Sequence, residues 1–278
     1  MVGRALRELC EASGDTVYAY DHGKLDIANA EDVWRAVDQA KPDAVINCAA
    51  WTDVDGCESD VERAFAVNAR GPENLAVASR DANAAFVTIS TDYVFDGTKQ
   101  GFYTQADAPD PQSVYGRAKL EGERLSRLAY DHSIVVRSGY IFGRGGTNFL
   151  STVVRRIQNA EKLKVISDTY GTPTYGRDLA ARLRELAQAG CGGIYHVVNS
   201  GPGVSFAEFT RETIALMGNP IVVVEEVSAA MLNRPANRPQ NSRLCCLRTE
   251  RIGLPPLRDW ESALGEFVKE YLATDFHG

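Results

Sequence analysis

The segment Ala85-Phe86-Val87-Thr88-Ile89-Ser90-Thr91-Asp92 begins as a short, almost continuously apolar run and ends in polar residues. A short run of this kind is typical of a strand that is buried on both faces of a sheet. Four further runs share the pattern, at residues 16–20, 44–48, 133–137 and 194–198. Longer helical stretches alternate with them, at residues 31–39, 61–81, 115–131 and 178–189. This alternation predicts an α/β fold with a doubly wound parallel sheet and helices on both faces.

The alternation loosens after residue 199. The sequence there predicts a helix over 206–217, a strand over 221–224, an irregular Pro/Asn/Arg stretch over 233–239 and a last helix over 260–272. A glycine-rich turn at 143–146 marks an earlier crossing into the same region. We therefore predict two parts. A dinucleotide-binding domain comprises residues 1–146 and 176–199, and a smaller α/β substrate-binding lobe comprises residues 147–175 and 200–278.

Composition is that of an ordinary globular protein: 278 residues, 44% hydrophobic, 24% charged, with a formal net charge of −7. The acidic balance argues against binding to nucleic acid or to an anionic membrane surface. No apolar run is long enough to span a bilayer, and the N-terminus lacks the apolar core of a signal peptide, so we expect a cytoplasmic protein. The six cysteines and four histidines show no metal-ligand or disulfide spacing, which predicts free thiols and no metal site.

Ligands of a doubly wound sheet bind beyond the carboxyl ends of its strands, where Thr91 lies. The next predicted helix opens with Tyr115 and Lys119, which are four residues apart and share one helix face. An ammonium beside a phenol lowers the tyrosine pKa, so Tyr115 can give a proton to a carbonyl oxygen as hydride reaches its carbon. The Thr91 hydroxyl can bind the same oxygen. The spacing alone is weak evidence, because Tyr20 and Lys24 share it and a surface pair on a helix would show it too.

Four segments occur in a characteristic order: Asn47-Cys48-Ala49-Ala50-Trp51-Thr52-Asp53-Val54-Asp55, Ser90-Thr91-Asp92-Tyr93-Val94-Phe95-Asp96-Gly97, Tyr115-Gly116-Arg117-Ala118-Lys119-Leu120-Glu121-Gly122-Glu123 and Arg238-Pro239-Gln240-Asn241-Ser242. Together they resemble the extended short-chain dehydrogenase/reductases, and within them the dTDP-4-dehydrorhamnose reductase family. The similarity extends from about Gly3 to Leu272. It implies NAD(P)H-dependent reduction of the 4-keto group of a nucleotide-sugar, dTDP-4-dehydro-L-rhamnose, to dTDP-L-rhamnose for cell-surface polysaccharide.

The resemblance also implies roles for individual residues. Tyr115 would be the proton donor, Lys119 would hold the nicotinamide ribose, and Thr91 would orient the reacting carbonyl. The remaining cofactor-binding residues would be Val2, Gly3, Asp26, Ile27, Ala49, Ala50, Trp51 and Thr52. The substrate would contact Thr91, Asp92, Tyr140, Asn148, Phe149 and Arg238. Plain packing is the alternative for Tyr140 and Phe149, and a solvated loop arginine is the alternative for Arg238, which otherwise offers a bidentate donor to pyrophosphate.

The choice between NADPH and NADH stays open. Asp21, at the end of its predicted strand, can bind a ribose 2′-hydroxyl and favour NADH, whereas Arg4 or Lys24 can accept a 2′-phosphate. Some members of the family dimerise with Mg²⁺, so the resemblance leaves a homodimer and this ion open as well, although the sequence identifies no ligands for it.

The sequence departs from the family pattern at two places. Relatives begin with a strand and a glycine-rich turn, of which Gly3 matches only the last glycine. Either this chain is a truncated or mis-started form of an active reductase, or the protein naturally lacks the strand and binds dinucleotides weakly or not at all. The second departure is Cys245-Cys246, where relatives usually carry an acidic or polar residue.

Two other functions compete with the reductase hypothesis. One is a non-catalytic regulatory or binding subunit on the same scaffold, which the incomplete glycine turn favours and the intact set of Thr91, Tyr115 and Lys119 does not. The other is a nucleotide-sugar epimerase or dehydratase. A dehydratase usually needs an acid-base pair beside the threonine, and Asp92-Tyr93 is not an obvious one.

Overall fold

A four-stranded parallel sheet forms the centre of the larger part of the molecule in a computed structural model, which describes residues 1–146, 148–159, 161–219 and 221–275. The strands are β1 (Ala44–Asn47), β2 (Ala85–Thr91), β3 (Ile134–Ser138) and β8 (Gly193–His196), in the order β1-β2-β3-β8. Ala44 lies opposite Ala85, and Ile134 lies opposite both Val87 and Gly193. The predicted parallel sheet is confirmed. Residues 147, 160, 220 and 276–278, which the predicted second lobe includes, lie outside the described residues.

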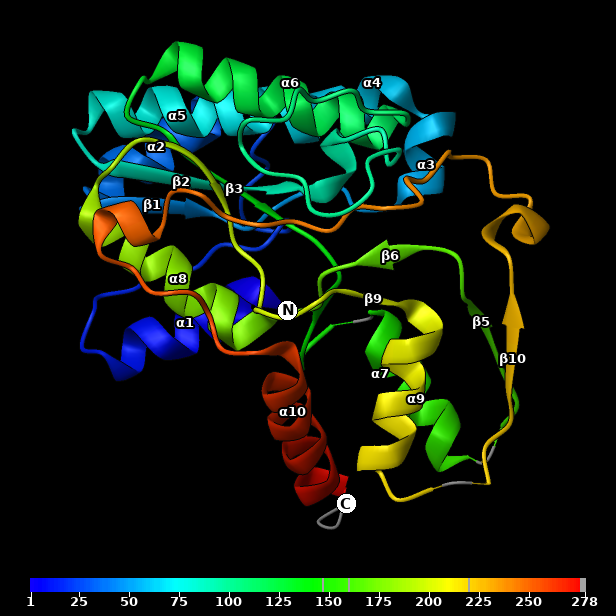
Figure 1. Ribbon diagram of the computed structural model, residues 1–278. Helices are drawn as coiled ribbons and strands as arrows, with labels where there is room; N and C mark the ends of the chain where they lie inside the picture. Colours follow the sequence, from blue (N-terminus) through cyan, green and yellow to red (C-terminus); the bar gives the residue numbers. More distant parts are fainter. Residues whose placement is uncertain (147, 160, 220, 276–278) are drawn as a thin grey trace.

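Helices cover both faces of this sheet (Figure 1). On one face lie α2 (Ala30–Ala40), α5 (Gly71–Asp81) and α6 (Val114–Ala129), and on the other lie α1 (Val2–Ala12) and α8 (Gly176–Ala189). Successive strand residues point to opposite faces, so Phe86 of β2 joins a core with Val33 and Leu75, while Val87 joins a second core with Leu183. The doubly wound arrangement is therefore confirmed.

The predicted helix over 61–81 is one helical path made of three pieces. These are α4 (Val61–Phe65), the π-helical turn η1 (Ala66–Arg70) and α5. A π-turn widens the helix by one residue, and such turns frequently occur at functional sites. Before this path comes the short α3 (Val54–Ser59), whose N-cap is Asp53.

The predicted strand over 16–20 is wrong. Residues 16–20 are irregular, Tyr18 is 59% exposed, and no backbone hydrogen bond joins this segment to another among the described residues. A strand needs a neighbour to satisfy its backbone groups. The sheet ends at β1, so residues 16–20 have no strand beside them and only connect α1 to the turn that begins at Asp21.

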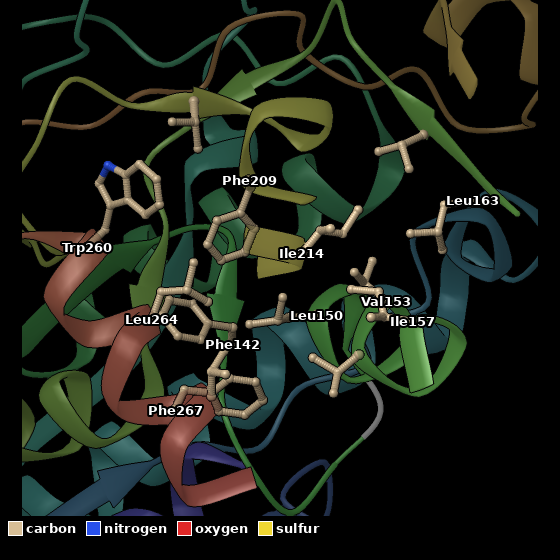
Figure 2. Close-up of a cluster of buried hydrophobic side chains, with 14 of the residues drawn as sticks. Phe142, Leu150, Val153, Ile157, Leu163, Phe209, Ile214, Trp260, Leu264 and Phe267 are labelled. Atoms are coloured by element: carbon tan, nitrogen blue, oxygen red, sulfur yellow. The ribbon is translucent and has the colours of Figure 1, made fainter. Parts of the chain in front are cut away.

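The second part of the molecule is built on helices α7 (Phe149–Gln158), α9 (Phe206–Leu216) and α10 (Trp260–Asp275) (Figure 1). Three small sheets accompany them: β4 (Ile141–Phe142) with β7 (Thr174–Tyr175), β5 (Leu163–Ile166) with β10 (Val224–Val227), and β6 (Tyr170–Gly171) with β9 (Val204–Ser205). Figure 2 shows the core between these elements, in which Phe142, Leu150, Phe209, Trp260 and Phe267 gather. Because this core is separate from the two beside the main sheet, the part has its own source of stability.

The predicted strand over 221–224 is displaced along the chain. Pairing begins at Val224, which lies opposite Leu163 of β5, and continues through the charged residues to Val227. Ile221 is 82% exposed. The partner strand β5 begins at Leu163, so the register of the pair rather than the apolar run determines where β10 begins.

Candidate active site

Thr91 lies at the carboxyl end of β2, and the start of α6 is fixed against it. The Ser113 hydroxyl caps α6 by accepting a hydrogen bond from the Gly116 amide at 3.1 Å. A side chain at Gly116 would overlap the carbonyl oxygen of Tyr93, so only glycine permits this close approach. The rings of Tyr93 and Tyr115 consequently meet edge to face, with their centroids 6.0 Å apart.

Asp92 is buried beside Thr91. The Thr91 hydroxyl donates a hydrogen bond to Asp92 Oδ1 at 3.1 Å and accepts one from the Tyr93 amide at 3.1 Å. Burial raises the pKa of Asp92 to about 6, although interactions with Ser242 and Thr91 act in the opposite direction. Asp92 Oδ2 is buried without a hydrogen-bond partner. The strand end therefore holds a buried carboxylate, one oxygen of which has no hydrogen-bond partner among the described residues.

Tyr115 and Lys119 both lie on the buried side of α6, with Lys119 4% exposed. Lys119 Nζ donates a hydrogen bond to the Ile89 carbonyl at 2.6 Å, and burial lowers the pKa of Lys119 to about 8, which the nearby Glu123 charge partly opposes. Burial raises the pKa of Tyr115 above its ordinary value, while interaction with Thr91 lowers it. The expectation of a lowered Tyr115 pKa is therefore wrong in this structure, because desolvation dominates. Tyr115 keeps its proton at neutral pH, which suits a proton donor.

The segment from Ala49 to Thr52 follows β1 and is held by two asparagines. The Ala49 amide donates to Asn47 Oδ1 at 2.9 Å. Trp51 exchanges two hydrogen bonds with Asn68 of η1, each 2.9 Å long. The Arg63 guanidinium lies 4.5 Å from the centre of the Trp51 ring. These contacts give the predicted cofactor-binding loop a defined backbone path.

Gly3 lies in the first turn of α1, where a Cβ atom would be 3.4 Å from Cys48 Cβ. A methyl group at this position would therefore be in ordinary van der Waals contact with the residue that follows β1. Helix α1 has no side-chain hydrogen bond at its N-cap, Met1, and the Met1 carbonyl accepts hydrogen bonds from the Arg4 and Ala5 amides. Val2 is buried in the core between α1, α8 and the sheet.

Asp26 and Ile27 lie in the turn before α2. Asp26 Oδ1 accepts a hydrogen bond from the Ala28 amide at 3.0 Å. Ile27 is buried, and a Cβ at Gly71 would be 2.6 Å from its Cδ1 atom. Asn74 Nδ2 donates to the Ile27 carbonyl at 3.0 Å. The Ile27 side chain therefore packs in the core against α5, and its assignment to the adenine site stays a prediction.

Tyr140 and Phe149 are brought together by Phe206 of α9, which the sequence reasoning missed. The Tyr140 and Phe206 rings stack with centroids 4.2 Å apart, and Phe149 lies 4.6 Å from Phe206. Tyr140 has a positive φ of 44°, and its hydroxyl donates to the Thr169 carbonyl at 3.2 Å. Burial raises the pKa of Tyr140, and the nearby Tyr93 and Asp92 act in the same direction. Tyr140 follows Ser138, which lies opposite Thr91 in the sheet, so this aromatic cluster is close to the end of β2.

Asn148 and Arg238 already have partners within the protein. Asn148 caps α7, with Oδ1 accepting from the Ser151 amide and Nδ2 donating to the Gly143 carbonyl at 2.9 Å. Arg238 donates two hydrogen bonds to the Asp55 carboxylate, at 2.9 and 2.8 Å. A ligand at Arg238 therefore has to share or displace Asp55.

The polar residues behind the site were not identified from sequence. Asn68, Glu123 and Arg137 are buried and make side-chain hydrogen bonds to the loop after β1 or to one another. Two features of the sequence could have indicated such residues: an asparagine in the middle of a predicted helix, and a carboxylate four residues after Lys119. Among the described residues, no group of three or more histidine, cysteine or acidic side chains is arranged to hold a metal ion, and no helix is long and apolar enough to cross a membrane.

Comparison with known proteins gives a consistent result. The family model described as RmlD substrate binding domain matches residues 1–273. The dTDP-4-dehydrorhamnose reductase of Streptomyces griseus is 39% identical over 272 residues, which cover 96% of this chain and 89% of that protein. The crystal structure of dTDP-4-dehydrorhamnose reductase from Bacillus anthracis strain Ames in complex with NADP has a TM-score of 0.93 and 33% identity, covering 97% of this chain and 95% of that chain. The chain therefore belongs to the RmlD substrate binding domain family, among the dTDP-4-dehydrorhamnose reductases and their relatives.

Proposed function

We propose that the protein is an NAD(P)H-dependent reductase that converts dTDP-4-dehydro-L-rhamnose to dTDP-L-rhamnose. The observation that carries this proposal is the position of Tyr115 and Lys119 on one face of α6, with Thr91 at the adjacent strand end. The activity of the Streptomyces griseus relative, which is similar over 96% of this chain, supports the choice of substrate.

In the proposed reaction the Thr91 hydroxyl binds the substrate's 4-keto oxygen, and Tyr115 donates its phenolic proton to that oxygen. The bound nicotinamide cofactor supplies the hydride that reduces C4. Tyr115 is left as a phenolate, which the positive charge of Lys119 stabilises. One hydride and one proton convert the ketone to a secondary alcohol, and solvent later restores the proton of Tyr115.

We place the cofactor along residues 1–146 and 176–199, and the chain offers groups that fit it. Val2 and Gly3 at the start of α1 would hold the pyrophosphate, and the segment from Ala49 to Thr52 would line the nicotinamide half. Asp26 and Ile27 would flank the adenine, and Lys119 would hold the nicotinamide ribose. The NADP of the Bacillus anthracis structure supports NADPH as the first cofactor to test.

We place the nucleotide-sugar between this part and the lobe of residues 147–175 and 200–278. Asp92, beside Thr91 at the strand end, would contact the sugar. Tyr140 and Phe149, which both pack on Phe206, would contact the nucleotide-sugar. Asn148 would bind at the start of α7. Arg238 would face the pyrophosphate, with Asp55 holding its guanidinium in a bidentate geometry until the substrate arrives.

The test is NADPH oxidation with dTDP-4-dehydro-L-rhamnose, followed at 340 nm, with the product identified by mass spectrometry. We expect Tyr115→Phe to lower kcat by about 100-fold or more, because the proton donor is lost, while NADPH binding is retained. Tyr20→Phe is the matched control, since Tyr20 and Lys24 have the same four-residue spacing but Tyr20 is 47% exposed. Turnover that survives in Tyr115→Phe at the level of Tyr20→Phe would overturn the proposal.

A further inference from the structure

Glu123 lies one helical turn after Lys119 on α6, and its buried carboxylate is bonded to two strands at once. Oε1 accepts hydrogen bonds from Ser90 Oγ at 2.5 Å and from Arg137 Nε at 2.9 Å, and Oε2 accepts one from Arg137 Nη2 at 2.7 Å. Ser90 and Arg137 are opposite each other in the pairing of β2 with β3. The Glu123 and Arg137 side chains are 4% and 3% exposed. A helix side chain is thus fastened to the carboxyl ends of two neighbouring strands.

The same helix face is fastened to β2 by Lys119. Lys119 Nζ donates to the carbonyl of Ile89, and Glu123 accepts from the hydroxyl of Ser90, the next residue along the strand. Thr91 follows directly. Ile89 and Ser90 are consecutive residues of β2, and the side chains that bind them are one helical turn apart on α6. These two hydrogen bonds together fix the position of α6 along β2. They therefore fix where Tyr115 stands relative to Thr91.

The two charges of the Glu123–Arg137 ion pair act on different neighbouring residues. Its carboxylate acts on Lys119, whose pKa it raises against the effect of burial. The Arg137 guanidinium acts on His196 instead. Burial lowers the pKa of His196 to about 3, and the guanidinium adds to this effect. The guanidinium also lies 5.2 Å from the centre of the Phe95 ring. His196 is therefore neutral at pH 7. The pair presents its negative end to Lys119 and its positive end to β8.

Other charged groups lie on the elements packed against α6. They are Asp55 and Glu58 of α3, Glu62 and Arg63 of α4, Arg70 of η1, Glu73, Arg80 and Asp81 of α5 and Asp92 of η2 (Asp92–Val94), and the same elements carry the titratable Cys57 and Tyr93. The charge that acts on the Lys119 pKa is that of Glu123. Removing this one carboxylate should therefore change the charge state of Lys119.

We propose that Glu123 is a positioning residue of the reductase: held by Arg137 and Ser90, it fixes the Tyr115–Lys119 face of α6 against the Thr91 end of β2 and places a carboxylate one helical turn from Lys119. This inference rests on the proposed function, because the charge matters to the reaction only if Lys119 stabilises the Tyr115 phenolate. A merely structural contact would not need a charge, since apolar residues of similar volume often replace a buried ion pair without loss of stability.

The test measures Lys119 directly, in the full chain labelled with ε-¹³C lysine. The Lys119 signal is assigned with Lys119→Arg, and its chemical shift is followed against pH. We expect Glu123→Gln to lower the Lys119 titration midpoint by about one pH unit or more, because an opposite charge close by is lost. Glu121→Gln is the matched control: it removes the same charge from the same helix, but Glu121 pairs with Arg124 at the surface, so we expect a shift below about 0.2 units.

Two more variants keep the test decisive if Glu123→Gln does not fold. Arg137→Lys keeps both charges of the pair, so we expect the Lys119 midpoint to stay near that of the unaltered chain. The double variant Glu123→Leu/Arg137→Met removes both charges together, which leaves no unpaired buried charge. We expect a smaller fall in the midpoint than in Glu123→Gln, because loss of the Arg137 charge partly offsets loss of the carboxylate. A Lys119 midpoint that stays unchanged in the double variant would overturn the inference.

The kinetic assay separates this inference from the function on which it rests. We expect the alkaline limb of the kcat profile to move to lower pH in Glu123→Gln by the same amount as the Lys119 midpoint. An unaltered chain that does not reduce the sugar would refute the proposed function even if the midpoint moves. A chain that reduces the sugar while neither the midpoint nor the alkaline limb moves would refute the role of Glu123 alone.

Discussion

Trp51 and Asn68 are joined by two reciprocal hydrogen bonds: the Trp51 amide donates to Asn68 Oδ1, and Asn68 Nδ2 donates to the Trp51 carbonyl, both at 2.9 Å. Asn68 belongs to the π-helical turn η1 and is 1% exposed. One buried side chain therefore satisfies both backbone groups of a loop residue. The helical path after β1 and the loop that we assign to the cofactor are thereby held in one arrangement.

Removing this link should weaken both folding and cofactor binding. In Asn68→Ala the two backbone groups of Trp51 lose their partners, and we expect a loss of about 1–3 kcal/mol in the free energy of unfolding. Because the Ala49–Thr52 loop then has to be ordered by the ligand, we expect the Kd for NADPH to rise about tenfold. Urea unfolding and quenching of tryptophan fluorescence by NADPH measure the two effects.

Asn219→Ala provides the matched control for that experiment. Asn219 Nδ2 also donates to a backbone carbonyl, that of Ile157 at 3.1 Å, but it lies in the second part of the molecule. We expect it to leave the Kd unchanged. Equal Kd values for the two variants would contradict the role given to Asn68.

Gly122 allows α6 to touch the backbone of η1. A Cβ atom at Gly122 would overlap the carbonyl oxygen of Asn68, which cannot move without breaking the contact with Trp51. We therefore expect Gly122→Ala to destabilise the fold by about 1–3 kcal/mol, in spite of the better helix propensity of alanine. Gly265 of α10 has no atom within 4 Å of its own Cβ position, so Gly265→Ala should stabilise by about 0.5–1 kcal/mol. Two variants with the same sign in thermal unfolding would contradict this explanation.

The sequence was most informative where local pattern and tertiary partners agree. The run that begins at Ala85 becomes β2 because strands lie on both sides of it. Residues 16–20 have an equally good strand pattern and remain irregular, because no strand lies beside them. Apolar periodicity therefore predicts the capacity to form a strand, whereas pairing decides whether the strand forms.

The residues of the candidate site also fall into two groups, those that the sequence could indicate and those that it could not. Thr91, Tyr115 and Lys119 could be proposed from the sequence because the Tyr/Lys spacing on one helix face follows a polar strand end. Asn68, Glu123, Arg137 and Phe206 were not, because their roles depend on contacts between segments that are distant in the chain. The raised pKa of Tyr115 was missed for a related reason: the extent of burial, which outweighs the neighbouring charge, is a property of the folded surroundings.

The ion pair between Arg238 and Asp55 should determine how firmly the substrate's pyrophosphate is bound. Arg238 binds Asp55 through both Nη atoms, and the Ala236 amide donates to the same carboxylate at 3.0 Å. Arg238→Lys removes the planar two-point donor, and we expect the KM for the nucleotide-sugar to rise about tenfold with little change in kcat. Arg234→Lys is the control, because Arg234 is an exposed arginine in the same stretch. If both variants raise KM equally, general positive charge rather than the geometry of Arg238 is responsible.

Asp92 should make the stability of the protein depend on pH between about 4 and 6. Burial raises its pKa in the folded protein from 3.8 to about 6, so the folded state binds the proton more tightly than the unfolded state does. The stabilisation from this group is therefore complete below pH 4 and is lost as the pH rises through 6. At pH 7 the ionised carboxylate is buried with Oδ2 unpartnered, and the shift of about two units corresponds to about 3 kcal/mol.

The pH dependence can be isolated by comparing unfolding free energies of the protein and of Asp92→Asn in urea at several pH values. The amide that replaces the carboxyl group cannot ionise, so we expect the stability of the variant relative to the protein to rise between pH 4 and pH 6 and to level off above pH 7. Asp96→Asn should give the opposite slope. Hydrogen bonds from Thr98 and Tyr103 lower the pKa of Asp96, so its contribution is present at neutral pH and is lost on acidification. If the difference in unfolding free energy between Asp92→Asn and the protein stays the same across this pH range, the pKa of Asp92 is not raised by folding. Water or a neighbouring donor would then reach Oδ2, and burial would destabilise this carboxylate no more than that of an ordinary surface aspartate.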